Sequence, residues 1–190
     1  MNNAGEPSGM KIYLLLFTVM LVSMRPVNAE DVNITITGEI VIPPCIVNNG
    51  GNIDVDFGSV SVTDVTNARN VKTLSVPVTC TYYQGTPYVR VRGTQLSGAA
   101  SNILATDVSR FGIALYQGTS ADPSAAMMLG DGQSGSNGSY LGYPIQSGSL
   151  SGVNQANGQF TFTAVPFQLG STLLAAGAFS ASASMSISYQ

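Results

Sequence analysis

Residues 32–42 read VNITITGEIVI and stand directly before Pro43, Pro44 and Cys45. Successive side chains of a strand point to opposite faces, so the even-numbered residues of this stretch share one face. β-branched residues dominate the stretch and no helical period fits it, so a strand is predicted. Its even face is apolar apart from one glycine and consists of Val32, Ile34, Ile36, Gly38, Ile40 and Ile42.

The end of the chain carries a second alternating pattern. Residues 177–190 read GAFSASASMSISYQ, in which every even position from 180 to 188 is serine. This period of two predicts another long strand with one apolar face. The odd, apolar positions are Phe179, Ala181, Ala183, Met185, Ile187 and Tyr189.

Shorter alternating segments lie between these two patterns. Strands are predicted for residues 53–57, 71–80, 88–92, 103–105, 111–116 and 160–164, with Pro77 indicating an edge or a bulge and Pro166 ending the last segment. Residues 130–139 and 147–158 are rich in glycine and serine and are predicted to be loops. Many short strands without an amphipathic helix predict an all-β antiparallel sandwich.

The first residues have the pattern of a secretory signal peptide. Lys11 precedes an apolar run over residues 12–22, and the small-residue site VNA ends at Ala29, where cleavage is expected. The run is shorter than the roughly 20 residues that span a bilayer, so no membrane span is predicted for the mature chain. Met10 offers a second start, which would leave residues 1–9 untranslated.

The two cysteines, Cys45 and Cys80, indicate an oxidising compartment. In an exported chain such a pair is predicted to form one disulfide, with two free thiols as the alternative. The chain contains no histidine, and two thiolates do not complete a zinc site, so neither a metal nor a cofactor is predicted.

Composition and charge exclude several function classes. The net charge of −3 offers no basic patch for nucleic acid. Without histidine, Ser-His-Asp and Cys-His catalysis are impossible, and no carboxylate pair stands out, so the chain is not predicted to be an enzyme. The segment GDGQSGSNGS lacks the Lys-Ser/Thr ending of a phosphate-binding loop. A weakly charged surface suits an extracellular β protein that packs against neighbours.

Pro43 and Pro44 separate the first strand from the rest of the chain, because proline lacks a donor and resists central pairing. Residues 30–44 are therefore interpreted as an arm and residues 45–190 as one domain. An arm so placed can pair with another molecule, whereas the alternative is an ordinary internal strand. Gly38 favours the arm, because a glycine in the apolar phase of a strand marks a close backbone approach.

Several segments resemble chaperone-usher pilus subunits, and more closely the minor tip subunits of P pili. They are VIPPCIVNNGGNIDVDFGSV at 41–60, ILATDVSRFGIALYQG at 103–118, FTFTAVPF at 160–167 and SASMSISYQ at 182–190. The family's tail pattern is also present, with Gly177 fourteenth from the end and Tyr189 next to last. The glycine- and serine-rich loops diverge from the family.

The resemblance implies an immunoglobulin-like sandwich that lacks its last strand. In this family a periplasmic chaperone lends the missing strand, and at the outer-membrane usher the next subunit's N-terminal arm replaces it. The even face of residues 32–42 would then be the donor, and the acceptor groove would be lined by Gly177, Phe179, Ala181, Ala183, Met185, Ile187 and Tyr189. The terminal carboxylate of Gln190 would meet basic chaperone residues.

The function that this resemblance implies is a structural tip adaptor of an adhesive fimbria on the bacterial surface, exported through the periplasm and joining the adhesin to the fibre. Its partners would be the chaperone, the usher and the neighbouring pilins. The alternative is a secreted carbohydrate-binding module, although the absence of tryptophan weakens it. Its candidate stacking residues are Tyr82, Tyr83, Tyr88, Tyr116, Tyr140 and Tyr143.

Overall fold

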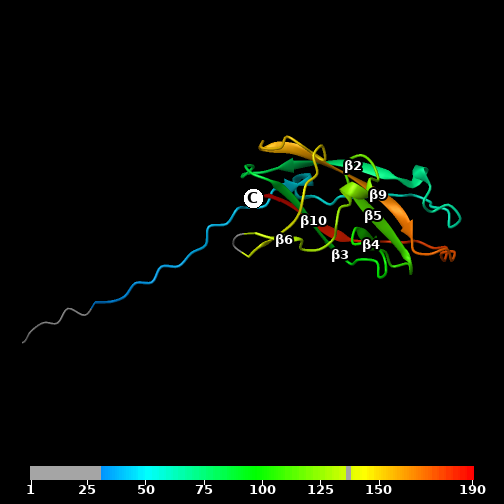
Figure 1. The fold of residues 1–190 in the computed structure, drawn as a ribbon, viewed down its shortest axis with the longest axis horizontal. Helices are drawn as coiled ribbons and strands as arrows, with labels where there is room; N and C mark the ends of the chain where they lie inside the picture. The colour runs from blue at the N-terminus through cyan, green and yellow to red at the C-terminus, as the bar shows by residue number, and fades with distance from the viewer. Residues whose placement is uncertain (1–30, 136–137) are drawn as a thin grey trace, which may run out of the picture. The chain divides into compact units, whose positions relative to one another are not determined.

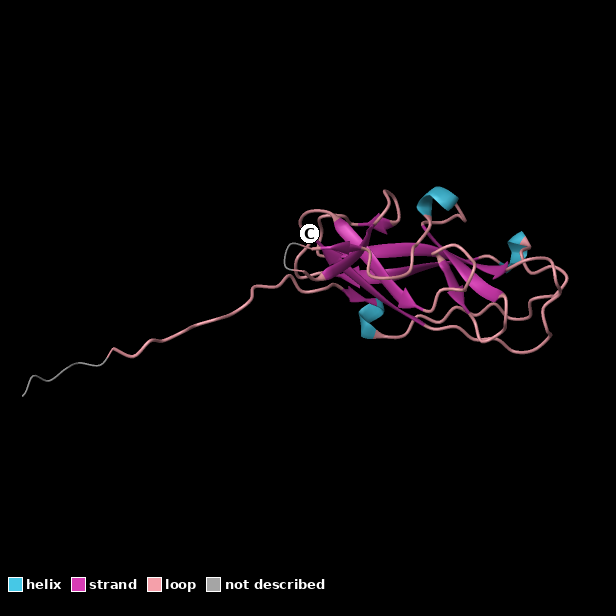
Figure 2. Ribbon diagram, turned by 60° about the horizontal axis from the view of Figure 1, so that its bottom comes forward, coloured by secondary structure: helices cyan, strands magenta, loops and turns pink. Residues whose placement is uncertain are grey.

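The computed structural model describes residues 31–135 and 138–190, so the predicted signal peptide lies outside the described residues. The chain divides into two units, residues 1–39 and residues 40–190. The second unit contains all the regular structure of the described ranges. Figure 2 shows that strands dominate it and that its helical turns are short.

The larger sheet is antiparallel and is built around β9 (Asn157–Gln168). Its strand order is β1 (Ile46–Val47), β2 (Lys72–Thr79), β9, β5 (Phe111–Gln117) and β4 (Ile103–Ala105), and β8 (Leu150–Ser151) also pairs with β9. The pairing of β2 with β9 runs from Lys72 opposite Ala164 to Thr79 opposite Asn157. This register places the even-numbered apolar residues of both strands on the inner face.

The smaller sheet has the order β10 (Ala183–Tyr189), β3 (Pro87–Gly93), β7 (Tyr140–Pro144) and β6 (Gln133–Ser134). β10, red in Figure 1, is the last strand along the chain and forms one edge of this sheet. Single helical turns, η1 (Asn48–Gly50), η2 (Ala68–Asn70) and η3 (Pro123–Ala125), lie in the connections.

The core lies between the two sheets, as the alternation predicts. Each sheet contributes the apolar face of its strands, and the side chains interleave in one cluster. Phe160 and Ile187 have no exposed surface at all. The central members are Val76, Val78, Phe160 and Phe162 from the larger sheet and Val89, Val91, Ile187 and Tyr189 from the smaller one. The all-β sandwich and most of its predicted strands are confirmed.

Two predicted strands are absent and a third is shortened. Residues 31–45 and 51–61 have no strand structure, and the strand predicted for 177–190 begins only at Ala183. Side-chain alternation is present in all three, but a ladder also requires a partner backbone. Within 31–135 and 138–190, no strand pairs with 31–45 or 51–61.

Proline does not end β9 as predicted, since the strand continues through Pro166 to Gln168. Pro166 lies opposite Ile113 in the ladder of β9 with β5. Hydrogen-bonded and non-bonded pairs alternate along an antiparallel ladder, and Leu169 N donates to Arg110 O, so Pro166 and Ile113 form a non-bonded pair. The nitrogen of Pro166, which carries no hydrogen, therefore points toward the β2 side. No residue of β2 pairs with Pro166, because β2 begins only at Lys72, opposite Ala164. Proline is tolerated at such an unpaired edge.

The glycine- and serine-rich segments are mostly loops, but they also contain β6 and β8, two residues each. Sequence reasoning missed β7, which follows the first of these segments. Gly142 within β7 has a φ of 93°, and an added Cβ would lie 2.2 Å from Val89 O. The close approach of β7 to β3 therefore requires a glycine there.

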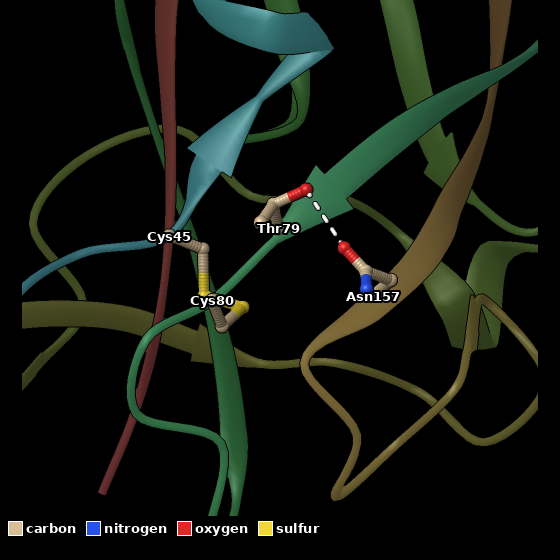
Figure 3. The surroundings of a disulfide bond; sticks show 4 residues. All are labelled: Cys45, Thr79, Cys80 and Asn157. Atoms are coloured by element: carbon tan, nitrogen blue, oxygen red, sulfur yellow. Dashed lines mark hydrogen bonds between the residues drawn. A yellow bond between two sulfur atoms is a disulfide. The ribbon is translucent and has the colours of Figure 1, made fainter.

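The predicted disulfide between Cys45 and Cys80 is present (Figure 3), with the two Cα atoms 4.3 Å apart. It ties the residue before β1 to the residue after β2. Cys45 N also donates to Ile187 O on β10 at 2.8 Å, which joins the start of the domain to its last strand.

Replacing both cysteines by serine is expected to reduce the free energy of unfolding by about 3 to 4 kcal/mol, because the bridge closes a loop with a sequence separation of 35 residues. Urea denaturation of this variant, compared with the parent protein under oxidising conditions, measures this loss. A midpoint that does not change would show that the bridge contributes nothing to stability.

Candidate functional site: an open groove beside β10

A groove of about 730 Å³ opens between the two sheets. One wall is the segment leading into β10, with Phe179, Ala181 and Ala183, and continues to Met185. The other wall is residues 51–57. Core side chains of both sheets form the floor, among them Val91, Ile113, Leu115, Phe162 and Ala164. The interior of the sandwich is therefore uncovered along this line.

The backbone of β10 faces this groove with unpaired groups. Val91 O accepts from Gly130 N, and Pro87 O accepts from Ile145 N. The backbone C=O groups of the odd-numbered residues of β3 therefore point away from β10. Their partners in the β10 register, Ala183 and Met185, therefore exchange no hydrogen bonds with β3. Ile187, the next odd-numbered residue of β10, has the same orientation, because its C=O accepts from Cys45 N and not from β3. The N–H and C=O groups of Ala183 and Met185 thus point into the open edge.

The opposite wall is also free of pairing. Ile53, Val55 and Phe57 are half-buried and alternate with exposed neighbours, as the sequence predicts, but residues 53–57 make no backbone ladder with the rest of the described chain. Two backbone segments that lack ladder partners on this side therefore border one apolar floor. A single strand inserted between them would complete both ladders and cover the floor.

The structure distributes the predicted acceptor residues along this groove. Phe179, Ala181, Ala183 and Met185 line it, and the two alanines are exposed. Ile187 and Tyr189 are instead buried in the core beyond its end. Gly177 lines a separate cavity of about 100 Å³. Gln190 pairs with Thr86, since Thr86 N donates to Gln190 O at 2.7 Å.

At the Phe179 end of the groove the structure shows contacts with Phe57, Phe111 and Asp107 that sequence reasoning missed. Phe179 packs edge-on against Phe111 with ring centroids 4.7 Å apart, and it contacts Phe57 of the opposite wall at 6.2 Å. The next residue, Ser180, donates its backbone N–H to Asp107 Oδ1 at 2.8 Å and its hydroxyl to Oδ2 at 2.9 Å. No local pattern links residues 73 positions apart, so only the fold could identify this contact.

Hydrogen bonds from the Ser180 backbone N–H and hydroxyl hold the pKa of the Asp107 carboxyl below its ordinary value. The bonds favour the charged form, so their contribution is fully present above the ordinary aspartate pKa. It is lost as the pH falls through the lowered pKa. In an NMR titration, the Ser180 amide shift is expected to move with a midpoint below that of an unfolded aspartate. A midpoint at or above that value would contradict the contact.

The predicted donor residues belong to a part of the chain without secondary structure. The side chains of Val32, Ile34, Ile36 and Ile40 are 81%, 83%, 89% and 99% exposed. An added Cβ on Gly38 would meet nothing within 4 Å. Large β-branched side chains in succession are costly to expose to water.

Other kinds of site find little support in the described residues. No group of three or more potential metal ligands occurs there, and no helix there is long and apolar enough to cross a membrane. The tyrosines proposed for sugar stacking do not share one face: Tyr88 and Tyr140 lie on the smaller sheet, whereas Tyr116 lies on the larger one.

Comparison with known proteins agrees with this geometry. A family model described as "Fimbrial protein" matches residues 34–190. The chain is 42% identical to the fimbrial adapter PapF and 41% identical to the minor fimbrial protein PrsF, both of Escherichia coli. Each comparison spans 178 residues, 94% of this chain and 99% of the relative.

Solved structures show the same fold. The P pilus adaptor subunit PapF, 36% identical, superposes with a TM-score of 0.52 over 80% of this chain and 100% of that chain. A subunit of a chaperone-usher pilus, 18% identical, superposes with a TM-score of 0.51 over 87% and 99%, which concerns the fold alone. These relatives are structural proteins rather than enzymes. The chain therefore belongs to the fimbrial protein family, the chaperone-usher pilins.

Proposed function

We propose that this minor fimbrial subunit works by exchanging strands with its neighbours. Its groove beside β10 receives an extended strand from another molecule, and its own arm, residues 30–44, fills the groove of a neighbouring pilin. The observation that carries this proposal is the unpaired edge of β10 above an uncovered apolar floor. Sheet edges of this kind are completed by strand addition.

The arm has the features that such an incoming strand needs. Its even residues present five Val or Ile side chains on one face. Burial of these side chains contributes on the order of 7 to 15 kcal/mol. Ladder hydrogen bonds to the two walls add about 1 kcal/mol net each. Gly38 would lie where the incoming backbone approaches the groove most closely.

The partners follow from this chemistry. Before assembly, a periplasmic chaperone would cover the groove with a strand of its own. At the outer-membrane usher, a neighbouring pilin's arm would replace that strand. Similarity to PapF and PrsF, named as an adapter and a minor fimbrial protein, supports a position between the tip adhesin and the fibre.

Deletion of residues 30–42 tests the arm. The shortened subunit is expected to remain bound to its chaperone, because its groove is intact, but to fail to join the subunit that receives the arm. Copurification with the chaperone and the composition of isolated fibres measure the two properties separately. Normal incorporation into fibres would overturn the assignment of the arm.

A further inference from the structure

The segment between β9 and β10 has a single polar anchor along its second half. Within residues 173–182, all of which are described, every hydrogen bond joins Ser180 to Asp107. There are three: the two bonds to the carboxylate and one from Asp107 N to Ser180 O at 3.1 Å. Side chains before the anchor, such as Leu173, are largely exposed.

Asp107 itself lies in a well-fixed turn between β4 and β5. The hydroxyl of Thr106 donates to Phe111 O at 2.9 Å and accepts from Val108 N at 3.1 Å. Phe111 N donates to Val108 O at 3.1 Å, which closes the turn. The backbone that carries Asp107 is therefore fixed by bonds that do not involve Ser180.

This anchor fixes the residue that shapes the end of the groove. Phe179 precedes Ser180, lines both the groove and the smaller cavity, and packs against Phe111 and Phe57. In the absence of an incoming strand, no ladder holds this wall. Without the anchor, residues 177–182 would have to be ordered at the moment of strand capture, which costs conformational entropy.

We propose that Asp107 is a positioning residue of the groove, which holds Ser180 and Phe179 in the strand-receiving arrangement while the groove is empty. This inference rests on the proposed strand exchange. An incoming strand would hold the same wall through its own ladder once bound. Loss of the anchor should therefore slow association and leave dissociation nearly unchanged, whereas general destabilisation of the domain would change both.

The test uses the processed chain freshly released from its periplasmic chaperone, so that the groove is empty when the peptide is added. A fluorescent synthetic peptide of residues 31–44 serves as the incoming strand, and anisotropy follows its association. Asp107→Ala is expected to slow association about tenfold, equivalent to about 1.4 kcal/mol. Asp107→Asn, which keeps one acceptor oxygen, should give an intermediate rate. Hydrogen exchange within residues 177–182 should accelerate in the same order.

Asp122→Ala is the matched control. Asp122 also accepts from the backbone N–H and hydroxyl of a serine, Ser124, both at 2.8 Å, but Ser124, unlike Ser180, does not line the groove. Its variant should associate at the parent rate. If the Asp107 variants associate as fast as this control, or if their dissociation changes as much as their association, the inference fails. If the parent chain takes up no peptide at all, the proposed strand exchange fails instead.

Discussion

Ile36→Asp in the arm is expected to prevent this chain from joining the subunit whose groove receives the arm, while leaving the chain's own domain folded. Ile36 lies in the middle of the apolar face that would enter a neighbour's groove. The substitution removes about 1.5 to 3 kcal/mol of apolar burial. It also buries a carboxylate without a partner, at a further cost of about 2 kcal/mol or more. Together these terms weaken the pairing about a thousandfold.

The control is Thr37→Asp, one residue further along the arm. Thr37 belongs to the polar face, which would point away from the groove, so its variant should assemble almost normally. Assembly of each variant with the receiving subunit can be followed by gel electrophoresis without boiling, which preserves strand-exchanged complexes. An equal loss of assembly in both variants would contradict the prediction that the even-numbered residues of the arm enter the groove.

Met185→Asp is expected to prevent the chain from receiving a strand. Met185 lines the groove, and its backbone groups point toward the open edge. An aspartate there would be buried without a partner once a strand covered it, so affinity for the peptide of residues 31–44 should fall by at least a hundredfold. Peptide anisotropy measures the affinity, and circular dichroism checks that the sandwich is retained.

Ser186→Asp provides the comparison on the same strand. Ser186 belongs to the even face of β10, does not line the groove and lies across from Arg90 in the β3 register. An opposite charge beside an arginine is well tolerated on a sheet surface. Peptide binding should therefore stay near the parent value. A Ser186 variant that binds as weakly as the Met185 variant would show that the groove does not lie on the odd face.

The alternation of side chains was enough to predict the sandwich, because a period of two reports which face of a strand is buried. In residues 71–80, 88–92, 111–116 and 160–164 the alternation places Val78, Val89, Ile113 and Phe160 on one apolar face of each predicted strand, and all four are buried. The disulfide followed from the export signal and the cysteine count. The family resemblance added what the pattern alone left open, namely that the sandwich is incomplete.

Pairing could not be predicted in the same way, because the partner of a strand is a matter of long-range geometry. Residues 53–57 and 177–182 have the alternation of strands but no ladder. The contacts of Phe179 with Phe57, and of Ser180 with Asp107, join segments that share no local signal. The prediction that Pro166 ends its strand was wrong for a related reason. Proline ends a strand only where its nitrogen would have to donate to a neighbouring strand, and the sequence does not show which side that nitrogen faces.

Hydrogen exchange at individual amides of β10 tests the open edge most directly. The measurement compares the chain freshly released from its chaperone with the same chain after addition of the peptide of residues 31–44. The amides of Ala183 and Met185 should exchange rapidly in the free chain and become protected with the peptide, whereas those of Ser184 and Ser186, already bonded to β3, should be protected in both. Protection of Ala183 and Met185 in the lone chain, or no response to the peptide, would contradict the account.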